Sequence, residues 1–224
     1  MNRPVALVTG FEPYGGRGLN PAAEVVARVD GIEINGARVV GRKFPVSFVS
    51  LRQSIRQTLA EVTPAVVISL GLWPGEAMIR LERIGTNVAD FEIPDNEGMV
   101  LADKELEAAD DAGRFATLPL SRIRDALIEA GIPARLSSTA GTFLCNATLY
   151  TFLGAIEESG KSVRCGFIHL PYLPEQVAGL IAETRAERSI ELHQRADIAS
   201  MSLETMVEAV HVALSVSLEN GADG

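Results

Sequence analysis

Two side chains in this sequence have the chemistry of a nucleophile and of a general base. Cys145 ends the segment STAGTFLC (138–145), in which a loop rich in Gly, Ser and Thr turns into an apolar helix. His169 ends the apolar segment SVRCGFIH (162–169), which is typical of a strand. A cysteine next to a histidine can carry out acyl transfer if the fold brings the sulfur and the imidazole into hydrogen-bonding reach. The structural alternatives, a small buried cysteine and a hydrogen-bonded core histidine, are both common.

Cys145 needs a partner if its thiol is to react near neutral pH. A free cysteine has a pKa of about 8.5, and lowering it by one unit takes about 1.4 kcal/mol. The N-terminus of a helix supplies only roughly 0.3–1 kcal/mol. Of the other histidines, His193 lies in a charged stretch and His211 on an amphipathic helix, so His169 is the best candidate. Cys165, earlier on the same strand, is predicted to be a core residue.

An acceptor that orients the histidine is harder to choose, because the chain has 29 acidic residues. Glu82 stands out in the segment IRLERI (79–84), which alternates like a strand. The alternative for Glu82 is an exposed strand residue paired with a neighbouring arginine. Asp95, in the segment IPDNEG (93–98), is a second candidate, although Pro-Asp-Asn is equally typical of a turn.

The glycine-rich segment TGFEPYGGRG (9–18) does not have the spacing of a phosphate-binding loop. Its aromatic residues, Phe11 and Tyr14, could instead form an apolar wall for a small ring, or they could simply pack beneath a loop. The three histidines and two cysteines are too scattered to predict a metal site.

The elements that would position these residues alternate between strand and helix. Strands are expected at 5–9, 65–70, 78–84, 134–138 and 162–169, and helices at 22–29, 47–62, 121–130, 143–156, 175–187 and 203–218. Asn35-Gly36 predicts a β-hairpin within 32–44, and 89–114 is expected to be a long loop. This order favours a single three-layer α/β/α domain over residues 1–224, built around a mostly parallel mixed sheet with a hairpin. In such sheets functional groups lie at the carboxyl ends of strands.

Composition narrows the class of protein further. The 224 residues carry a formal net charge of −9, and no block of Lys and Arg predicts a nucleic-acid surface. No run of 18 apolar residues predicts a membrane span. The first apolar run is too short for a signal peptide, and two isolated cysteines suit a reducing compartment, so we expect a cytoplasmic protein.

In this order the motifs resemble those of the pyroglutamyl peptidase I (pyrrolidone-carboxylate peptidase) family, which are cytoplasmic cysteine peptidases that remove N-terminal 5-oxoproline from peptides. The resemblance runs from about residue 5 to residue 176. It is carried by the segments TGFEPYGG (9–16), ERIGTN (82–87), IPDNEG (93–98), AGTFLCN (140–146) and GFIHLPYLPEQ (166–176).

The resemblance implies roles for particular residues. Cys145 would be the nucleophile, His169 the base and Glu82 the residue that orients it, with no cofactor. The substrate would be an N-terminally pyroglutamylated peptide, and bacterial members imply a homotetramer. The ring pocket would be lined by Phe11, Tyr14, Ile93, Phe143 and Leu144, with backbone groups of Leu72 nearby.

One segment departs from the family pattern. Where the family reads Gly-Gln-Ala-Gly-Gly-Arg, this chain reads GLWPGE (71–76). Leu72 still offers its backbone groups, whereas Trp73 adds bulk and Pro74 removes an N–H donor. This departure leaves two alternatives open, a catalytically weak homologue that serves as a small-molecule binding module and a cysteine amidohydrolase with a shifted substrate.

Overall fold

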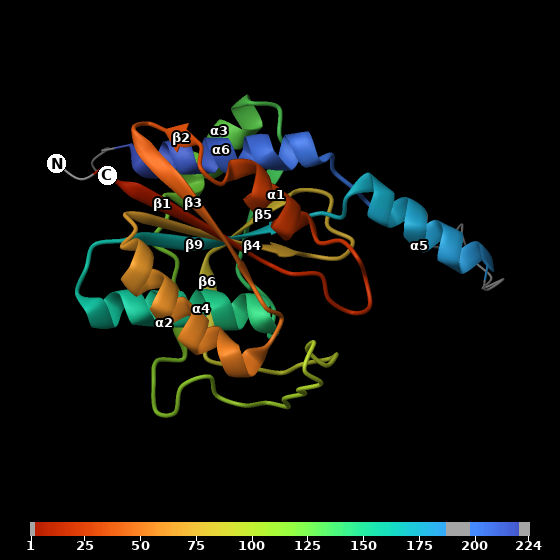
Figure 1. Cartoon of the computed structure of the whole chain (residues 1–224), viewed down its shortest axis with the longest axis horizontal. Coiled ribbons are helices and arrows are strands. Elements are labelled where there is room, and N and C mark those ends of the chain that lie inside the picture. The colour runs from red at the N-terminus through yellow and green to blue at the C-terminus, as the bar shows by residue number, and fades with distance from the viewer. Residues whose placement is uncertain (1–2, 187–197, 220–224) are drawn as a thin grey trace.

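A seven-stranded sheet forms the centre of the computed structural model, which describes residues 3–186 and 198–219 (Figure 1). Its strands are β1 (Val5–Phe11), β2 (Glu33–Ile34), β3 (Ala37–Phe44), β4 (Val66–Leu72), β5 (Ile79–Glu82), β8 (Ala134–Ser137) and β9 (Arg164–Leu170). They lie in the order β2-β3-β1-β4-β9-β5-β8. Strands β3, β1, β4 and β9 are parallel, β5 runs antiparallel to β9, and β8 is parallel to β5. The mostly parallel mixed sheet is confirmed.

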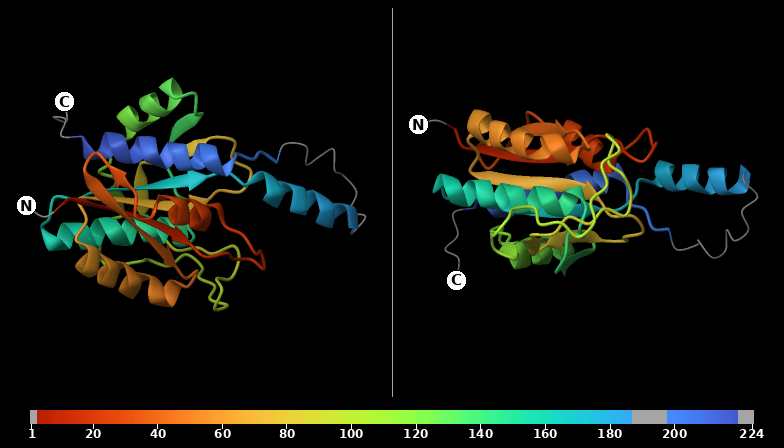
Figure 2. Two further views of the ribbon diagram at one scale, coloured as in Figure 1. Left: turned by 45° about the horizontal axis from the view of Figure 1, so that its top comes forward. Right: turned by 90° about the horizontal axis from the view of Figure 1, so that it is seen from below.

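Helices cover both faces of this sheet. The helices of the described residues are α1 (Pro21–Val29), α2 (Phe48–Val62), α3 (Leu120–Glu129), α4 (Leu144–Ser159), α5 (Pro174–Ala186) and α6 (Leu203–Leu218). Helices α1, α3 and α6 pack on one face, and α2 and α4 pack on the other (Figure 1). Helix α5 extends away from the sheet in both views of Figure 2. The three-layer α/β/α arrangement is therefore confirmed.

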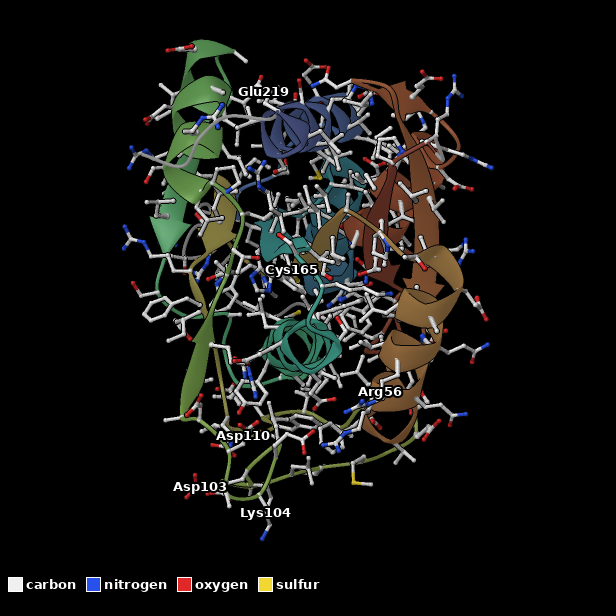
Figure 3. The ribbon with its side chains drawn as sticks, turned by 90° about the vertical axis from the view of Figure 1, so that its left-hand side faces the viewer. Arg56, Asp103, Lys104, Asp110, Cys165 and Glu219 are labelled. Carbon is white, nitrogen blue, oxygen red and sulfur yellow. The ribbon has the colours of Figure 1, made fainter. Side chains whose placement is uncertain are left out.

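The central strands are apolar because helices cover them on both sides. The whole of β4 is buried, and β1 and β9 are buried beyond their first residue. Cys165, on β9, lies in the interior with 1% of its surface exposed, as predicted (Figure 3). No helix within the described ranges is both long and apolar enough to span a bilayer.

Local signals in the sequence place several element boundaries. The Asn20 side chain accepts a hydrogen bond from Ala22 N (3.0 Å) and caps α1, as its position before Pro21 predicts. Asn35 and Gly36 have φ values of 49° and 77°, which suits a type I′ hairpin between β2 and β3.

The single strand expected at 78–84 is wrong beyond Glu82. Strand β5 ends at Glu82, and β6 (Ile84–Thr86) pairs instead with β7 (Gly113–Phe115) in a separate two-stranded sheet. Between them, the backbone of Arg83 bonds to Ser137 O (2.9 Å) through its N–H and to Ala116 N (2.8 Å) through its carbonyl. The chain thereby leaves the main sheet, and β6 packs against α4.

Of the histidines set aside above, His211 is half-buried on α6, and His193 lies outside the described residues.

The close contact between β6 and α4 depends on Gly85. A Cβ at this position would lie 2.8 Å from the backbone N of Tyr150, and neither backbone can move away easily. We expect Gly85→Ala to lower the free energy of unfolding by about 1–3 kcal/mol, measured by urea denaturation. Gly18→Ala is the control, because nothing lies within 4 Å of its added Cβ. Equal midpoints for the two variants would contradict this account.

Candidate active site

Two neighbouring strands, β9 and β5, present polar side chains to one face of the sheet, and a glycine of β4 lies beside them. Gly71 of β4 pairs with His169 of β9, and His169 pairs with Arg80 of β5. Glu82 lies two residues beyond Arg80, and side chains two residues apart on a strand share a face. Because β5 runs antiparallel to β9, its charged residues lie beside the carboxyl end of β9. Helix α4 covers this face and carries Cys145 in its first turn.

A buried hydrogen bond joins His169 to Glu82. The distance from His169 Nδ1 to Glu82 Oε1 is 2.8 Å, and the side chains are 1% and 0% exposed. The alternative for Glu82, an exposed residue paired with an arginine, is therefore wrong about exposure, although Arg80 Nε also donates to Oε1 (2.8 Å). Oε1 of Glu82 thus accepts hydrogen bonds from both His169 and Arg80.

The electrostatics of this pair favour a neutral imidazole beside a carboxylate. Burial lowers the pKa of His169 below its ordinary value of 6.5, even though the contact with Glu82 works in the opposite direction. Burial alone would raise the pKa of the Glu82 carboxyl, but hydrogen bonds from His169 and from Arg80 hold that pKa below its usual value. Neutral His169 therefore donates through Nδ1–H and leaves Nε2 as an acceptor.

Cys145 is the second residue of α4 and lies close to the same strands. Its Sγ is 2.8 Å from the point that a Cβ on Gly71 would occupy, so only glycine fits there. Burial raises the pKa of the Cys145 thiol to about 12, and the negative charge of Glu82 adds to this effect. The helix N-terminus does not outweigh burial. The thiol is therefore protonated at neutral pH.

The expected hydrogen bond between the sulfur and the imidazole is not formed. Within residues 3–186 and 198–219, no hydrogen bond joins Cys145 Sγ to His169, although both residues line one cavity. The Nδ1 side of the ring faces Glu82, and hydrogen bonds of this kind are often loose until a substrate is bound.

The first turn of α4 also provides free backbone donors. The first hydrogen bond of the helix runs from Ala147 N to Phe143 O (3.1 Å), so the N–H groups of residues 144–146 precede the helical ladder. This turn is held in place by the fully buried Asn146. Its Nδ2 donates to Thr86 O and Val88 O (2.9 Å each), and its Oδ1 accepts from Thr86 N (2.8 Å). No local pattern predicts this role of Asn146, because its partners Thr86 and Val88 are 60 and 58 residues away in the sequence.

A cavity of about 300 Å³ opens beside Cys145 and His169. Its lining includes all six residues predicted to bind substrate, namely Phe11, Tyr14, Leu72, Ile93, Phe143 and Leu144. The Phe143 ring lies 6.3 Å from the Tyr14 ring and 4.7 Å from the Phe91 ring, measured between centroids. Burial raises the pKa of Tyr14 to about 12, so its hydroxyl is neutral. Sequence reasoning missed Asn20, Val46, Asp90, Glu92 and Thr142, which also line the cavity.

The divergent segment 71–76 forms one wall of the cavity without filling it. The Trp73 ring meets the His169 ring edge-on, with 4.9 Å between centroids, and the Arg80 guanidinium lies 3.6 Å from the centre of the Trp73 ring. Glu76 is buried and forms ion pairs with Arg80 and Arg135. The bulk of Trp73 therefore packs over buried side chains.

Asp95, the second candidate to orient the histidine, has a different role. Its carboxylate accepts hydrogen bonds from the backbone N–H groups of Phe48, Glu97 and Met99 at 2.8–2.9 Å. The turn interpretation of Asp95 is thus correct. Among the residues that the structure describes, no three His, Cys, Asp or Glu side chains are grouped to hold a metal ion.

Comparisons of the sequence and of the structure with known proteins all match one family. The family model described as pyroglutamyl peptidase matches residues 5–220. A pyrrolidone-carboxylate peptidase of Pyrococcus furiosus is 40% identical over 213 residues, which are 95% of this chain and 97% of that protein. Another, from Enterobacter sp. (strain 638), is 40% identical and covers 97% and 94% of the two chains. A mutant pyrrolidone carboxyl peptidase from P. furiosus has a solved structure that superposes with a TM-score of 0.86 at 39% identity, covering 95% and 97% of the two chains.

Asn146 provides a test of how the first turn of α4 is anchored. In Asn146→Asp a carboxylate replaces the amide that donates to two carbonyls. We expect the free energy of unfolding to fall by about 2–4 kcal/mol, since one buried polar group without a partner costs about 1–3 kcal/mol. Urea denaturation measures the change. Asn35→Asp, which loses only exposed hydrogen bonds to Ser215, is the control, and equal losses in both variants would argue against an anchoring role.

Proposed function

The chain belongs to the pyroglutamyl peptidase family and is a cysteine omega-peptidase that removes N-terminal pyroglutamate, and we propose that Cys145, His169 and Glu82 perform this reaction as a triad within one domain spanning residues 1–224. The observation that carries the proposal is the buried hydrogen bond from His169 to Glu82 in the wall of the cavity that also contains Cys145. The tetramer expected from the resemblance stays a prediction.

In the first step His169 removes the proton from Cys145. Glu82 holds the Nδ1–H side of the ring, so Nε2 receives the proton. Because the pKa of the thiol is about 12, no thiolate is stored in the free protein, and proton transfer accompanies attack of the sulfur on the pyroglutamyl carbonyl carbon. A carbon–sulfur bond forms, and the carbonyl oxygen takes the negative charge. The free N–H groups at residues 144–146 are suited to stabilise that oxygen.

The intermediate formed by attack of the sulfur first loses the amine, and the resulting thioester is then hydrolysed. The carbon–nitrogen bond breaks, and the leaving amine takes the proton from His169, which leaves a thioester on Cys145. Water next gives a proton to His169 and attacks the thioester carbonyl. The carbon–sulfur bond breaks, the sulfur recovers its proton, and 5-oxoproline is released.

The cavity suits the chemistry of the substrate. A 5-oxoproline ring is small, flat and uncharged, so apolar packing and a few backbone hydrogen bonds should bind it. We assign this packing to Phe11, Tyr14, Ile93, Phe143 and Leu144, with Leu72 contributing its backbone groups. Ile93 is 45% exposed, which suits a position at the mouth of the cavity. Because Trp73 leaves the cavity open, we do not favour a binding module or a shifted substrate.

The nucleophile is tested by Cys145→Ala. We expect turnover of pyroglutamyl-aminomethylcoumarin to fall to less than about a thousandth of the wild-type rate, with an unchanged melting temperature. Cys165→Ala is the matched control, since Cys165 is a buried core thiol and its loss should affect stability more than turnover. Normal turnover by folded Cys145→Ala would refute the proposed triad.

The pH dependence tests the protonation states of the triad. Because the pKa of His169 is lowered, the base is neutral above that pKa, and activity is lost as the pH falls through it. We expect the acid limb of kcat/KM to lie below pH 6.5, the ordinary histidine value. No limb from a thiol is expected between about pH 7 and about pH 10, because the thiol stays protonated there. An acid limb above the ordinary value, or thiolate absorbance in the free protein at neutral pH, would contradict this mechanism.

A further inference from the structure

Arg80 is a buried cation that the steps above do not use. Its side chain is 6% exposed and makes contacts through all three guanidinium nitrogens. Nε donates to Glu82 Oε1 (2.8 Å), Nη2 donates to Ser137 Oγ (2.9 Å) and Thr139 O (2.8 Å), and Nη1 lies 3.6 Å from Glu76 Oε2. Burying a guanidinium costs free energy, and this set of partners offsets the cost.

Arg80 and His169 bind the same oxygen of Glu82. Oε1 accepts from both, while Oε2 is buried and has no hydrogen-bond partner among the described residues. The Glu82 carboxylate by itself would favour a protonated imidazole, because opposite charges attract. The positive charge of Arg80 opposes this effect, so that Glu82 can stay ionised while His169 stays neutral.

Glu76 acts on His169 in the opposite sense to Arg80. It lies on the loop that precedes β5 and is held by Arg80 and by Arg135 of β8. Its negative charge raises the pKa of His169, whereas burial and the charge of Arg80 lower it. The charged groups that act on His169 are thus Glu82 and Arg80 of β5 and Glu76 of the loop. In the described structure, four other titratable groups line the same cavity as His169, namely Tyr14, Asp90, Glu92 and Cys145.

We propose that Arg80 is a positioning residue for the reaction: it holds the Glu82 carboxylate in place and keeps His169 neutral, and Glu76 balances its charge. Arg80 acts through Glu82 and does not touch the reacting atoms. The consequence for catalysis rests on the proposed role of His169 as the base.

The test is an NMR titration of the His169 ring in the full-length protein, with its signal identified by its loss in His169→Asn. In Arg80→Met, which removes the charge but keeps an unbranched chain of similar length, the His169 midpoint should move to higher pH. In Glu76→Gln it should move to lower pH. The acid limb of kcat/KM should move in the same two directions.

Arg80→Lys separates charge from geometry. Lysine keeps the positive charge but cannot reproduce the planar fork that contacts Glu82, Ser137 and Thr139 together. We expect a His169 midpoint close to that of the wild type, a severalfold lower kcat, and a KM within about twofold, since the loss falls on positioning rather than on binding.

The proposal is overturned by the following outcomes. A His169 midpoint that stays in place in Arg80→Met, or that moves in the same direction as in Glu76→Gln, would leave Arg80 with only a structural role. If Arg80→Met does not fold, an unchanged midpoint in Glu76→Gln or a displaced midpoint in Arg80→Lys would overturn it equally. A different result would refute the proposed function alone. In that case the wild-type protein does not cleave pyroglutamyl amides, yet Arg80→Met and Glu76→Gln still move the His169 midpoint in opposite directions, which leaves the effect of Arg80 on His169 intact.

Discussion

The arrangement of the site depends on keeping one carboxylate charged where water does not reach it. Glu82 is fully buried, and an isolated carboxylate in that environment would take up a proton rather than pay for its desolvation. It stays ionised because His169 and Arg80 both bond to it. The pairing of β5 with β9 makes these bonds possible, because it places Arg80 directly opposite His169 with Glu82 on the same face. The antiparallel pair of β5 and β9 in a largely parallel sheet therefore positions the site.

Close packing of α4 on the sheet is the second constraint. The helix must approach β4 and β6 closely enough to bring its first turn to the strand ends. Gly71 and Gly85 make this possible, since a Cβ at either position would lie 2.8 Å from Cys145 Sγ or from Tyr150 N. Asn146 then ties the same turn to the end of β6 and the chain just beyond it, through three hydrogen bonds to backbone groups of Thr86 and Val88. Together these contacts set the position of the thiol and of the free N–H groups beside it.

The segment 71–76 shows how a family pattern can change without disturbing the centre. Glu76 stands where the family pattern has an arginine, and it lies against the buried Arg80. Trp73 packs over that guanidinium and along the edge of the His169 ring, which leaves the cavity open. Charge and aromatic surface in this segment therefore lie against His169 and Arg80 from outside the proposed triad.

The sequence by itself determined the order of most elements, β6 and β7 excepted, because hydrophobic periodicity, the Asn20 cap and the Asn35-Gly36 turn are local signals. It also marked Cys145, His169 and Glu82 as candidates, through residue type and resemblance. Only the tertiary structure decided that Glu82 is buried, that Asp95 belongs to a turn, and that the chain leaves the main sheet after Glu82. It alone revealed the contacts of Arg80 and Asn146, whose partners include groups about 60 residues distant. Strand pairing and helix packing bring such groups together, and neither is encoded in a local pattern.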